Sequence, residues 1–581
     1  MVRKAEGKGQ KAEVRNKSGA AIVLVVFAIV FSALSVGSYR QKSAAWDEPV
    51  HMSDAYASLI QHDYRIDPEH PPFVRMWAAL PLMAMQVVPF DLSILDKMPP
   101  GQWARTLYQS CTDFLYTNND ADRLLNASRF MIVLLGVALG ALVFLWAQAW
   151  LGFRPAVVAL ACYTLEPNIA AHASLVTTDM GLACFLFATV YFLWRTSRSA
   201  SPANVAGLLI SFALAVISKF SAIALLPIVV LLLAWSAWRR QAITPAKAAG
   251  LFALMIVVGY IAIWAVYGFR YAPSATPGWL YDFGNDTQVV SQVPTLARLI
   301  GWIDAHHLLP NSFSQGFLFG QAKAVVRRSF LLGEFSASGW WYYFPVAFAI
   351  KTPIGILLLF GIGAVAAVRR AASLGVDAVM YAAVPLVVYL ALSMTTHLNI
   401  GLRHLLPVYP FVMLFAGVAA KALLESRAKA GAIVLAALVA GTALEFGRTY
   451  PDNLAFFNAA VGGPDRGGEY LTDSNLDWGQ DLKPLKRWMD LNGVSSINLA
   501  YFGTALPQYY KMDVTYLPGS TFVPGEVKVN LPGYVAISAT VLNGVYLDNE
   551  QRAFYSSFRS RTPVARVGHT ILVYWVDKQW W

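Results

Sequence analysis

The chain has 581 residues, of which 57% are hydrophobic and 14% charged, and its formal net charge is +11 at pH 7. This composition excludes an ordinary soluble globular protein, because repeated apolar runs of about 20 residues are typical of membrane spans. It also argues against nucleic-acid binding, because the cations lie in short clusters between apolar runs, as the positive-inside rule expects. The three cysteines show neither a paired framework nor the spacing of metal ligands.

The chain begins with a basic tail, residues 1–19, which we expect on the cytoplasmic side. The apolar run at 20–38 is long and lacks a clear small-residue cleavage site, which favours a retained first span over a signal peptide. Ten more spans are expected at 129–150, 155–170, 177–194, 204–218, 221–238, 249–268, 345–368, 376–393, 404–421 and 430–446. The total of eleven is odd, so we expect an α-helical polytopic membrane protein whose C-terminus lies on the extracytoplasmic side.

Two acidic clusters lie in the first large outer loop, residues 39–127. Asp47 and Glu48 follow the first span closely. They either cap a helix and match its dipole or supply a carboxylate that takes a proton from an attacking hydroxyl. Glu69 and His70 precede two prolines that restrict the backbone, so they form either a rigid surface turn or a contact for a phosphate or a sugar.

Four ionisable residues are expected near the outer ends of spans: Asp179, Lys219, Arg403 and His404. Charged groups in such places are costly to bury and therefore are candidates for function. Asp179 either caps the span that it opens or faces Asp47 across a cavity, where it would contact acceptor or sugar or share a metal ion. The three cations either reach to lipid headgroups or bind a lipid-linked phosphate, for which a guanidinium fork and an ammonium are suited.

A second outer loop, residues 269–344, is aromatic and ends at Trp340 and Trp341, which favour the level of the lipid headgroups. From residue 447 the composition changes to that of a soluble domain. We predict a small extracytoplasmic α/β domain at 447–581. Its expected elements are a helix at 482–491 and strands at 496–502, 534–538 and 571–576.

The densest polar run of this C-terminal domain is Asp473 to Asp481. It lacks the Gly and Glu that an EF-hand loop needs at fixed positions. The favoured interpretation is the capped start of the helix at 482–491, and a sugar-binding loop is the alternative.

These motifs together resemble the GT-C glycosyltransferases. Trp46-Asp47-Glu48-Pro49 and Pro68-Glu69-His70-Pro71-Pro72 are similar to the first outer loop of the bacterial relatives of protein O-mannosyltransferases and of lipid A aminoarabinose transferases, which form glycosyltransferase family 39. Further similar runs are Leu175 to Met180, Ser218-Lys219-Phe220, Gly339 to Pro345, Gly401 to Pro407 and Asp473 to Gln480. His70 stands where the aminoarabinose transferases have lysine, and 269–344 is too short for the β-trefoil insertion of the protein mannosyltransferases.

The resemblance implies a multi-pass membrane enzyme that uses a polyprenyl- or dolichyl-phosphate sugar, with Asp47 acting at the acceptor. We expect transfer of one sugar to a hydroxyl of a protein, lipid or glycan on the extracytoplasmic face of a bacterial plasma membrane, with inversion. Catalytic roles fall on Asp47, Glu48 and Asp179, and sugar or acceptor contacts on Glu69, Trp340 and Trp341. The donor phosphate is expected at Lys219, Arg403, His404 and His70. The acids could also hold a divalent cation, and no other cofactor is indicated.

Two other functions remain open from the sequence. A transporter that flips a lipid-linked sugar would carry an internal repeat and functional polar residues at the middle of the membrane, and neither is visible. A ligase would move a whole polysaccharide from a diphosphate carrier. Mass analysis of the product distinguishes the ligase from a transferase of single sugars.

Overall fold

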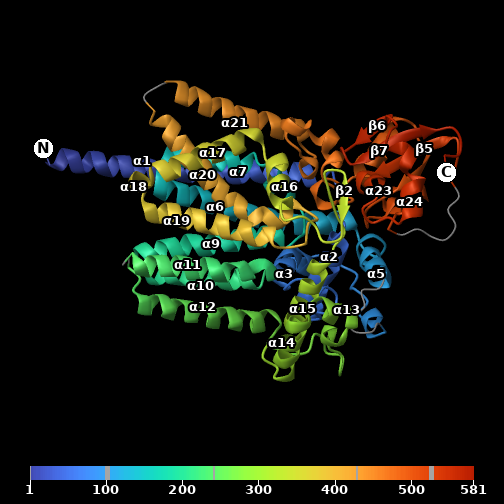
Figure 1. The fold of residues 1–581 in the computed structure, drawn as a ribbon, viewed down its shortest axis with the longest axis horizontal. Helices are drawn as coiled ribbons and strands as arrows, with labels where there is room; N and C mark the ends of the chain where they lie inside the picture. Colours follow the sequence, from blue (N-terminus) through green and yellow to red (C-terminus); the bar gives the residue numbers. More distant parts are fainter. Residues whose placement is uncertain (1, 98–104, 240–241, 427–428, 522–528, 581) are drawn as a thin grey trace.

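The computed structural model of the protein describes residues 2–97, 105–239, 242–426, 429–521 and 529–580. They form an elongated bundle of helices with a small α/β unit at one end, and the N-terminus lies at the other end (Figure 1). The predicted fold class, a helical membrane protein with a C-terminal α/β portion, is confirmed.

Eight helical segments in the described ranges are long and apolar enough to cross a membrane. They are Ser18–Tyr39 within α1 (Val2–Tyr39), α6 (Ala121–Leu151), α9 (Asp179–Arg198), η3 with α11 (Phe220–Trp238), α12 (Pro245–Val266), α19 (Val376–Met394), η5 with α20 (Leu402–Leu424) and α21 (Lys429–Thr449). A ninth would be the pair α16 (Tyr343–Lys351) and α17 (Ile354–Arg369), which is bent by 117°.

The other two expected spans are helices α7 (Phe153–Thr164) and α10 (Pro202–Val216), of 12 and 15 residues. At 1.5 Å per residue each is shorter than the hydrocarbon core of about 30 Å. The number of eleven spans therefore stays a prediction, although all eleven apolar runs lie on helices.

Helices α9 and α20 lie at the centre of the bundle, while α12 and α21 lie on opposite sides of it (Figure 1). The α9 sequence suits a helix end to end, because Asp179 stands in its first turn and Arg195 and Arg198 in its last, matching the helix dipole. Close packing at α17 depends on Gly363, where a Cβ would lie 1.9 Å from the carbonyl oxygen of Phe415 on α20.

The first outer loop folds into short helices: α2 (Glu48–Tyr56), η1 (Ala57–Gln61), α3 (Phe73–Ala79), η2 (Leu80–Ala84), α4 (Ser93–Asp96) and α5 (Arg105–Tyr116). The second contains η4 (Phe283–Asn285), α13 (Thr287–Gln292), α14 (Pro294–Ala305), α15 (Asn311–Val325) and a hairpin of β1 (Ser329–Leu331) and β2 (Glu334–Ser336). Both loops lie at the end of the bundle that carries the α/β unit (Figure 1).

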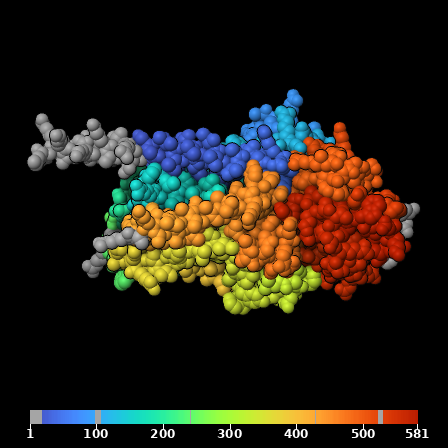
Figure 2. Space-filling view, turned by 90° about the horizontal axis from the view of Figure 1, so that it is seen from above, coloured from blue at the N-terminus to red at the C-terminus, as the bar shows by residue number. Residues whose placement is uncertain are grey.

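The described residues after α21 form what we call the C-terminal unit. Its five-stranded sheet has the order β4-β3-β5-β7-β6. The strands are β3 (Ser496–Ala500), β4 (Asp513–Tyr516), β5 (Gly533–Ser538), β6 (Ala565–Val567) and β7 (Ile571–Val576). Strand β3 pairs in parallel with β4 and β5, whereas β7 is antiparallel to β5 and β6. Three of these strands and helix α22 (Leu482–Leu491) match the predicted elements, and the unit sits directly against the bundle (Figure 2).

Candidate active site

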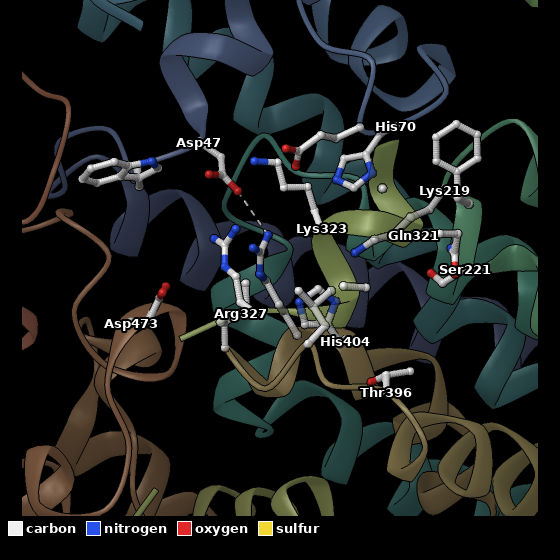
Figure 3. A pocket seen from close by; sticks show the side chains of 18 of the residues that line it. Asp47, His70, Lys219, Ser221, Gln321, Lys323, Arg327, Thr396, His404 and Asp473 are labelled. Atoms are coloured by element: carbon white, nitrogen blue, oxygen red, sulfur yellow. Dashed lines mark hydrogen bonds and ion pairs between the residues drawn. The ribbon is translucent and has the colours of Figure 1, made fainter. Parts of the chain in front are cut away.

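A cavity of about 690 Å³ lies where the outer loops, the ends of the spans and the C-terminal unit meet. Its wall includes residues from the first loop, η3, α15, η5 and the C-terminal unit, which are far apart in the sequence. Of the predicted site residues, Asp47, Glu69, His70, Lys219, Arg403 and His404 line it. Figure 3 shows side chains from these separate segments pointing into one space.

Asp47 and Arg403 face each other in this cavity. Asp47 is the residue before α2, and Arg403 stands near the start of η5. Arg403 Nη1 lies 3.3 Å from Asp47 Oδ2 (Figure 3, dashed line), and the two side chains are 8% and 28% exposed. Asp47 makes no side-chain cap to its helix, so its carboxylate is available to the cavity.

Asp179 neutralises two of the predicted cations. Its Oδ1 accepts a hydrogen bond from Lys219 Nζ at 2.5 Å, and its Oδ2 lies 3.7 Å from Arg403 Nη1. The Asp179 side chain is 2% exposed and does not line the cavity. Its carboxylate is thus turned to the cations behind the wall, where it holds Lys219 and Arg403 in place.

Glu69 and His70 follow a network of buried charges in the first loop. The carboxylate of Asp67 accepts hydrogen bonds from the Glu69 N–H, at 2.9 Å, and from the guanidinium of Arg75. Burial, with Asp67 nearby, raises the pKa of Glu69 to about 7. Burial and the ammonium of Lys219 lower the pKa of His70, so this imidazole is neutral at pH 7.

Two further cations in the wall, Lys323 and Arg327, were missed in the sequence. Lys323 lies in the last turn of α15, and Arg327 follows the helix end. Neither forms an ion pair with any residue in the described ranges, in contrast to Lys219 and Arg403. They point into the space beside Asp47 (Figure 3). Their spacing of four residues in an outer loop was the available signal.

The polar run from Asp473 to Asp481 joins the C-terminal unit to the site. Asp473 lines the cavity, and its carboxylate accepts hydrogen bonds from the hydroxyl of Tyr546 and from the N–H of Ser474, the latter at 2.6 Å. The ring of Trp478 also lines the cavity and lies 4.3 Å from Arg403 Cζ.

The favoured interpretation of this run as a helix cap is wrong. Asp481 precedes α22 but makes no side-chain cap to it. Its carboxylate instead accepts hydrogen bonds from Lys42 Nζ at 2.5 Å and from Thr570 Oγ1 at 2.7 Å. Asp481 therefore pairs with the buried Lys42, just after α1, and does not cap the N-terminus of α22.

Besides Asp179, three of the predicted site residues lie outside the cavity wall: Glu48, Trp340 and Trp341. Glu48 is fully buried, and its carboxylate accepts hydrogen bonds from Arg129 Nε at 2.8 Å and Nη2 at 2.5 Å. The backbone N–H groups of Ala45 and Val176 also donate to it, which leaves it no access to a substrate. The ring of Trp341 is 67% exposed, and Trp340, though partly buried, does not reach the wall either.

A metal ion was left open by the sequence. In the part of the chain that the structure describes, no group of three or more His, Cys, Asp and Glu side chains is arranged to hold one. The four cavity cations, Lys219, Lys323, Arg327 and Arg403, supply positive charge to the same space.

A sequence model of the family "dolichyl-phosphate-mannose-protein mannosyltransferase" matches residues 122–264. The predicted resemblance to these membrane glycosyltransferases is confirmed over this segment, which contains Asp179 and Lys219. Among curated protein sequences, none matches this chain significantly.

Several solved structures resemble the chain at a distance. ArnT from Cupriavidus metallidurans bound to undecaprenyl phosphate is 14% identical, with a TM-score of 0.44, over 96% of this chain and 98% of that one. The archaeal oligosaccharyltransferase AglB from Archaeoglobus fulgidus, with an inhibitory peptide and a dolichol-phosphate, is 12% identical, with a TM-score of 0.43, over 85% and 65%. The S. cerevisiae Pmt1–Pmt2 complex bound to the sugar donor is 15% identical, with a TM-score of 0.34, over 55% and 40%.

Proposed function

We propose that this chain, which carries a segment of the mannosyltransferase family, is a membrane enzyme that transfers one sugar from a polyprenyl phosphate to an acceptor hydroxyl. The observation that carries the proposal is the cavity itself. It holds the carboxylate of Asp47, whose side chain is 28% exposed, within reach of several cations, of which Lys323 and Arg327 form no ion pair among the described residues. A base beside an anion site is the combination that this reaction needs.

The shape of the cavity supports a lipid-linked donor. Ile223 and Leu392 line it and are 53% and 39% exposed on the outside of the bundle. Both lie at ends of spans, Ile223 in η3 and Leu392 in α19. An apolar wall that is open towards the lipid suits a prenyl chain, while the phosphate and the sugar occupy the charged part.

In the proposed reaction, the acceptor oxygen attacks the anomeric carbon and its proton passes to Asp47. The bond between that carbon and the phosphate oxygen breaks, and polyprenyl phosphate leaves as the anion. A phosphate leaving group is a weak base and needs charge stabilisation more than a proton. Lys323 and Arg327 would supply it, together with Arg403 and Lys219, which Asp179 positions. One displacement inverts the anomeric configuration, and the carbon gains oxocarbenium character on the way.

Two imidazoles complete the proposed donor site. His404 lines the cavity, and its Nε2 is buried without a hydrogen-bond partner among the described residues. His70 lies on the same wall. A ring N–H of each can donate a hydrogen bond to a phosphate or sugar oxygen. Glu69, next to His70, would accept a hydrogen bond from a sugar hydroxyl.

The proposed topology follows from the charge pattern of the sequence. The tail 1–19 would lie in the cytoplasm, 20–446 would form the catalytic membrane domain, and 447–581 would form the extracytoplasmic domain. The site and the C-terminal unit lie at the same end of the bundle, opposite the N-terminus (Figure 1). Transfer would therefore occur on the extracytoplasmic face, to a protein, lipid or glycan.

The test uses the purified full chain in liposomes with a panel of radiolabelled polyprenyl-phosphate sugars. An extract of the membranes from which the protein was purified is added as the source of acceptor. We expect one of the donors to be consumed and its label to appear in a component of this extract. Mass analysis should show one added sugar. If no donor of the panel is consumed while the protein is folded, or if a whole polysaccharide is moved, the proposed function is wrong.

A further inference from the structure

The two ends of the cavity differ in exposure and in the elements that build them. The end near Ile223 and Leu392 lies at the ends of spans and is open towards the outside of the bundle. The opposite end is built mainly of aromatic rings and contains Phe502 and Tyr546 of the C-terminal unit. Asp47 and the cations lie between these ends. If the donor tail occupies the end that opens to the outside of the bundle, the acceptor must approach from the aromatic end.

Three rings at this second end form a stack. Trp46 lies on Phe502, with ring centroids 4.6 Å apart and an angle of 21° between the planes. Phe502 lies on Tyr546 at 5.5 Å and 11°. The Thr504 hydroxyl donates to the Trp46 carbonyl at 2.9 Å, which ties the first loop to the C-terminal unit. All three rings line the cavity, and Trp46 is the neighbour of Asp47 in the chain.

The parallel strands of the C-terminal unit have their carboxyl ends at the aromatic end of the cavity. Phe502 follows the carboxyl end of β3, Gly519 follows that of β4, and Tyr546 comes after β5 and the short helix behind it. Strands β4, β3 and β5 are neighbours and run in parallel. Ligands of open α/β sheets bind in the space outside the carboxyl ends of such strands.

We propose that this aromatic end is the acceptor subsite and that the acceptor is a carbohydrate, which presents a pyranose ring to the stack formed by Trp46, Phe502 and Tyr546. A pyranose has a face of C–H groups, which are attracted to the negative face of aromatic rings, and a rim of hydroxyls. The carboxylates of Asp47 and Asp473 border the stack and accept hydrogen bonds from such hydroxyls. A serine or threonine side chain offers no comparable apolar face.

This inference rests on the proposed function, since it names the acceptor of that reaction, but binding can be tested without transfer. The probes are methyl α-mannopyranoside, methyl β-glucopyranoside and the peptide acetyl-Ala-Thr-Ala-amide. Binding to the full chain in lipid nanodiscs is followed by saturation-transfer difference NMR. The variants are Phe502→Leu and Trp46→Leu, which remove one ring each and keep an apolar side chain. The control is Trp575→Leu, since Trp575 is a half-exposed ring on β7 of the same unit, away from the cavity.

We expect at least one pyranoside to bind, with a dissociation constant about threefold to tenfold higher in either ring variant and unchanged in the control. Thermal unfolding shows which of the two ring variants are folded, and one folded ring variant is enough for the comparison of pyranoside binding. Absence of pyranoside binding, equal binding by a folded ring variant, or binding of the peptide alone would overturn the inference. If pyranosides bind as expected but no polyprenyl-phosphate sugar is consumed, the proposed function fails and the subsite stands.

Discussion

Replacing Asp47 by asparagine separates catalysis from stability more sharply than any other change at this site. The amide has nearly the same shape as the carboxylate but cannot accept the proton of the acceptor hydroxyl. Loss of a general base costs about 10²–10⁴ in rate, or about 3–5.5 kcal/mol of transition-state stabilisation. We expect the rate of sugar transfer by Asp47→Asn to fall by this factor, with a smaller change in the KM of the donor.

The cost of Asp47→Asn in stability should be small. The Asp47 side chain is 28% exposed and its closest contact with Arg403 is 3.3 Å, so the pair is partly screened and contributes about 1 kcal/mol or less. Arg403 also keeps a second acid, Asp179, at 3.7 Å. The midpoint of thermal unfolding in detergent should therefore shift by only a few degrees.

Asp179→Asn is the matched control, because it removes a carboxylate that is 2% exposed. It leaves Lys219, at 2.5 Å, as an uncompensated buried cation, at a cost of about 3–5 kcal/mol. Its unfolding midpoint should fall far more than that of Asp47→Asn. The assay pairs radiolabel transfer with thermal unfolding of both variants. Transfer by Asp47→Asn within about threefold of the parent would refute the assignment of the base, and equal midpoints would refute the division of roles.

Three further expectations concern the other charged groups. Glu48→Gln should lower the midpoint of thermal unfolding strongly, by about 3–5 kcal/mol of stability, because it leaves the guanidinium of Arg129 buried without its charge partner; an unchanged midpoint would contradict the structural role. Lys323→Ala and Arg327→Ala should each weaken binding of undecaprenyl phosphate by about tenfold to a hundredfold and reduce its salt dependence, measured by calorimetry, whereas equal affinity would remove them from the phosphate site. Burial raises the pKa of Glu69 from an ordinary 4.5 to about 7, so the folded protein binds this proton more tightly than the unfolded chain does. The stability that the bound proton contributes is lost as the pH rises from about 4.5 to 7. The unfolding midpoint of the parent should therefore fall over this window and that of Glu69→Gln should fall less, and an identical pH profile of the two proteins would contradict the shift.

The apolar runs and the short motifs were readable from sequence because both are local. The predicted spans lie on helices, because a run of about 20 apolar residues is long enough to cross the lipid, although 155–170 and 345–368 are each divided between two helices. The meeting of Asp47 with Arg403 was expected from their placement on one face, and the structure brings them together. Glu48, by contrast, follows Asp47 directly but points the other way, because successive helical residues are about 100° apart.

What the sequence could not show was set by packing between distant segments. Lys323 and Arg327 reach the cavity only because α15 folds back from the second outer loop against the first, where Gly316 lies so close that a Cβ would meet the carbonyl oxygen of Pro68 at 2.2 Å. The role of Asp481 depends on Lys42, which is 439 residues earlier in the chain. No local sequence pattern contains such distant partners, so a helix cap was the natural prediction for the run that ends at Asp481.

The contacts of Trp478 make the C-terminal unit part of the candidate site. Its carbonyl oxygen accepts a hydrogen bond from the N–H of Trp46 at 2.8 Å, so it holds the residue before Asp47. Its ring, 2% exposed, lies 4.3 Å from Arg403 Cζ, a contact worth about 0.5–2 kcal/mol. One residue therefore contacts both Arg403 and the chain neighbour of Asp47. A displacement of the C-terminal unit would move the proposed base, Asp47, relative to Arg403. The proposed reaction therefore requires this unit to be packed against the bundle as it is here.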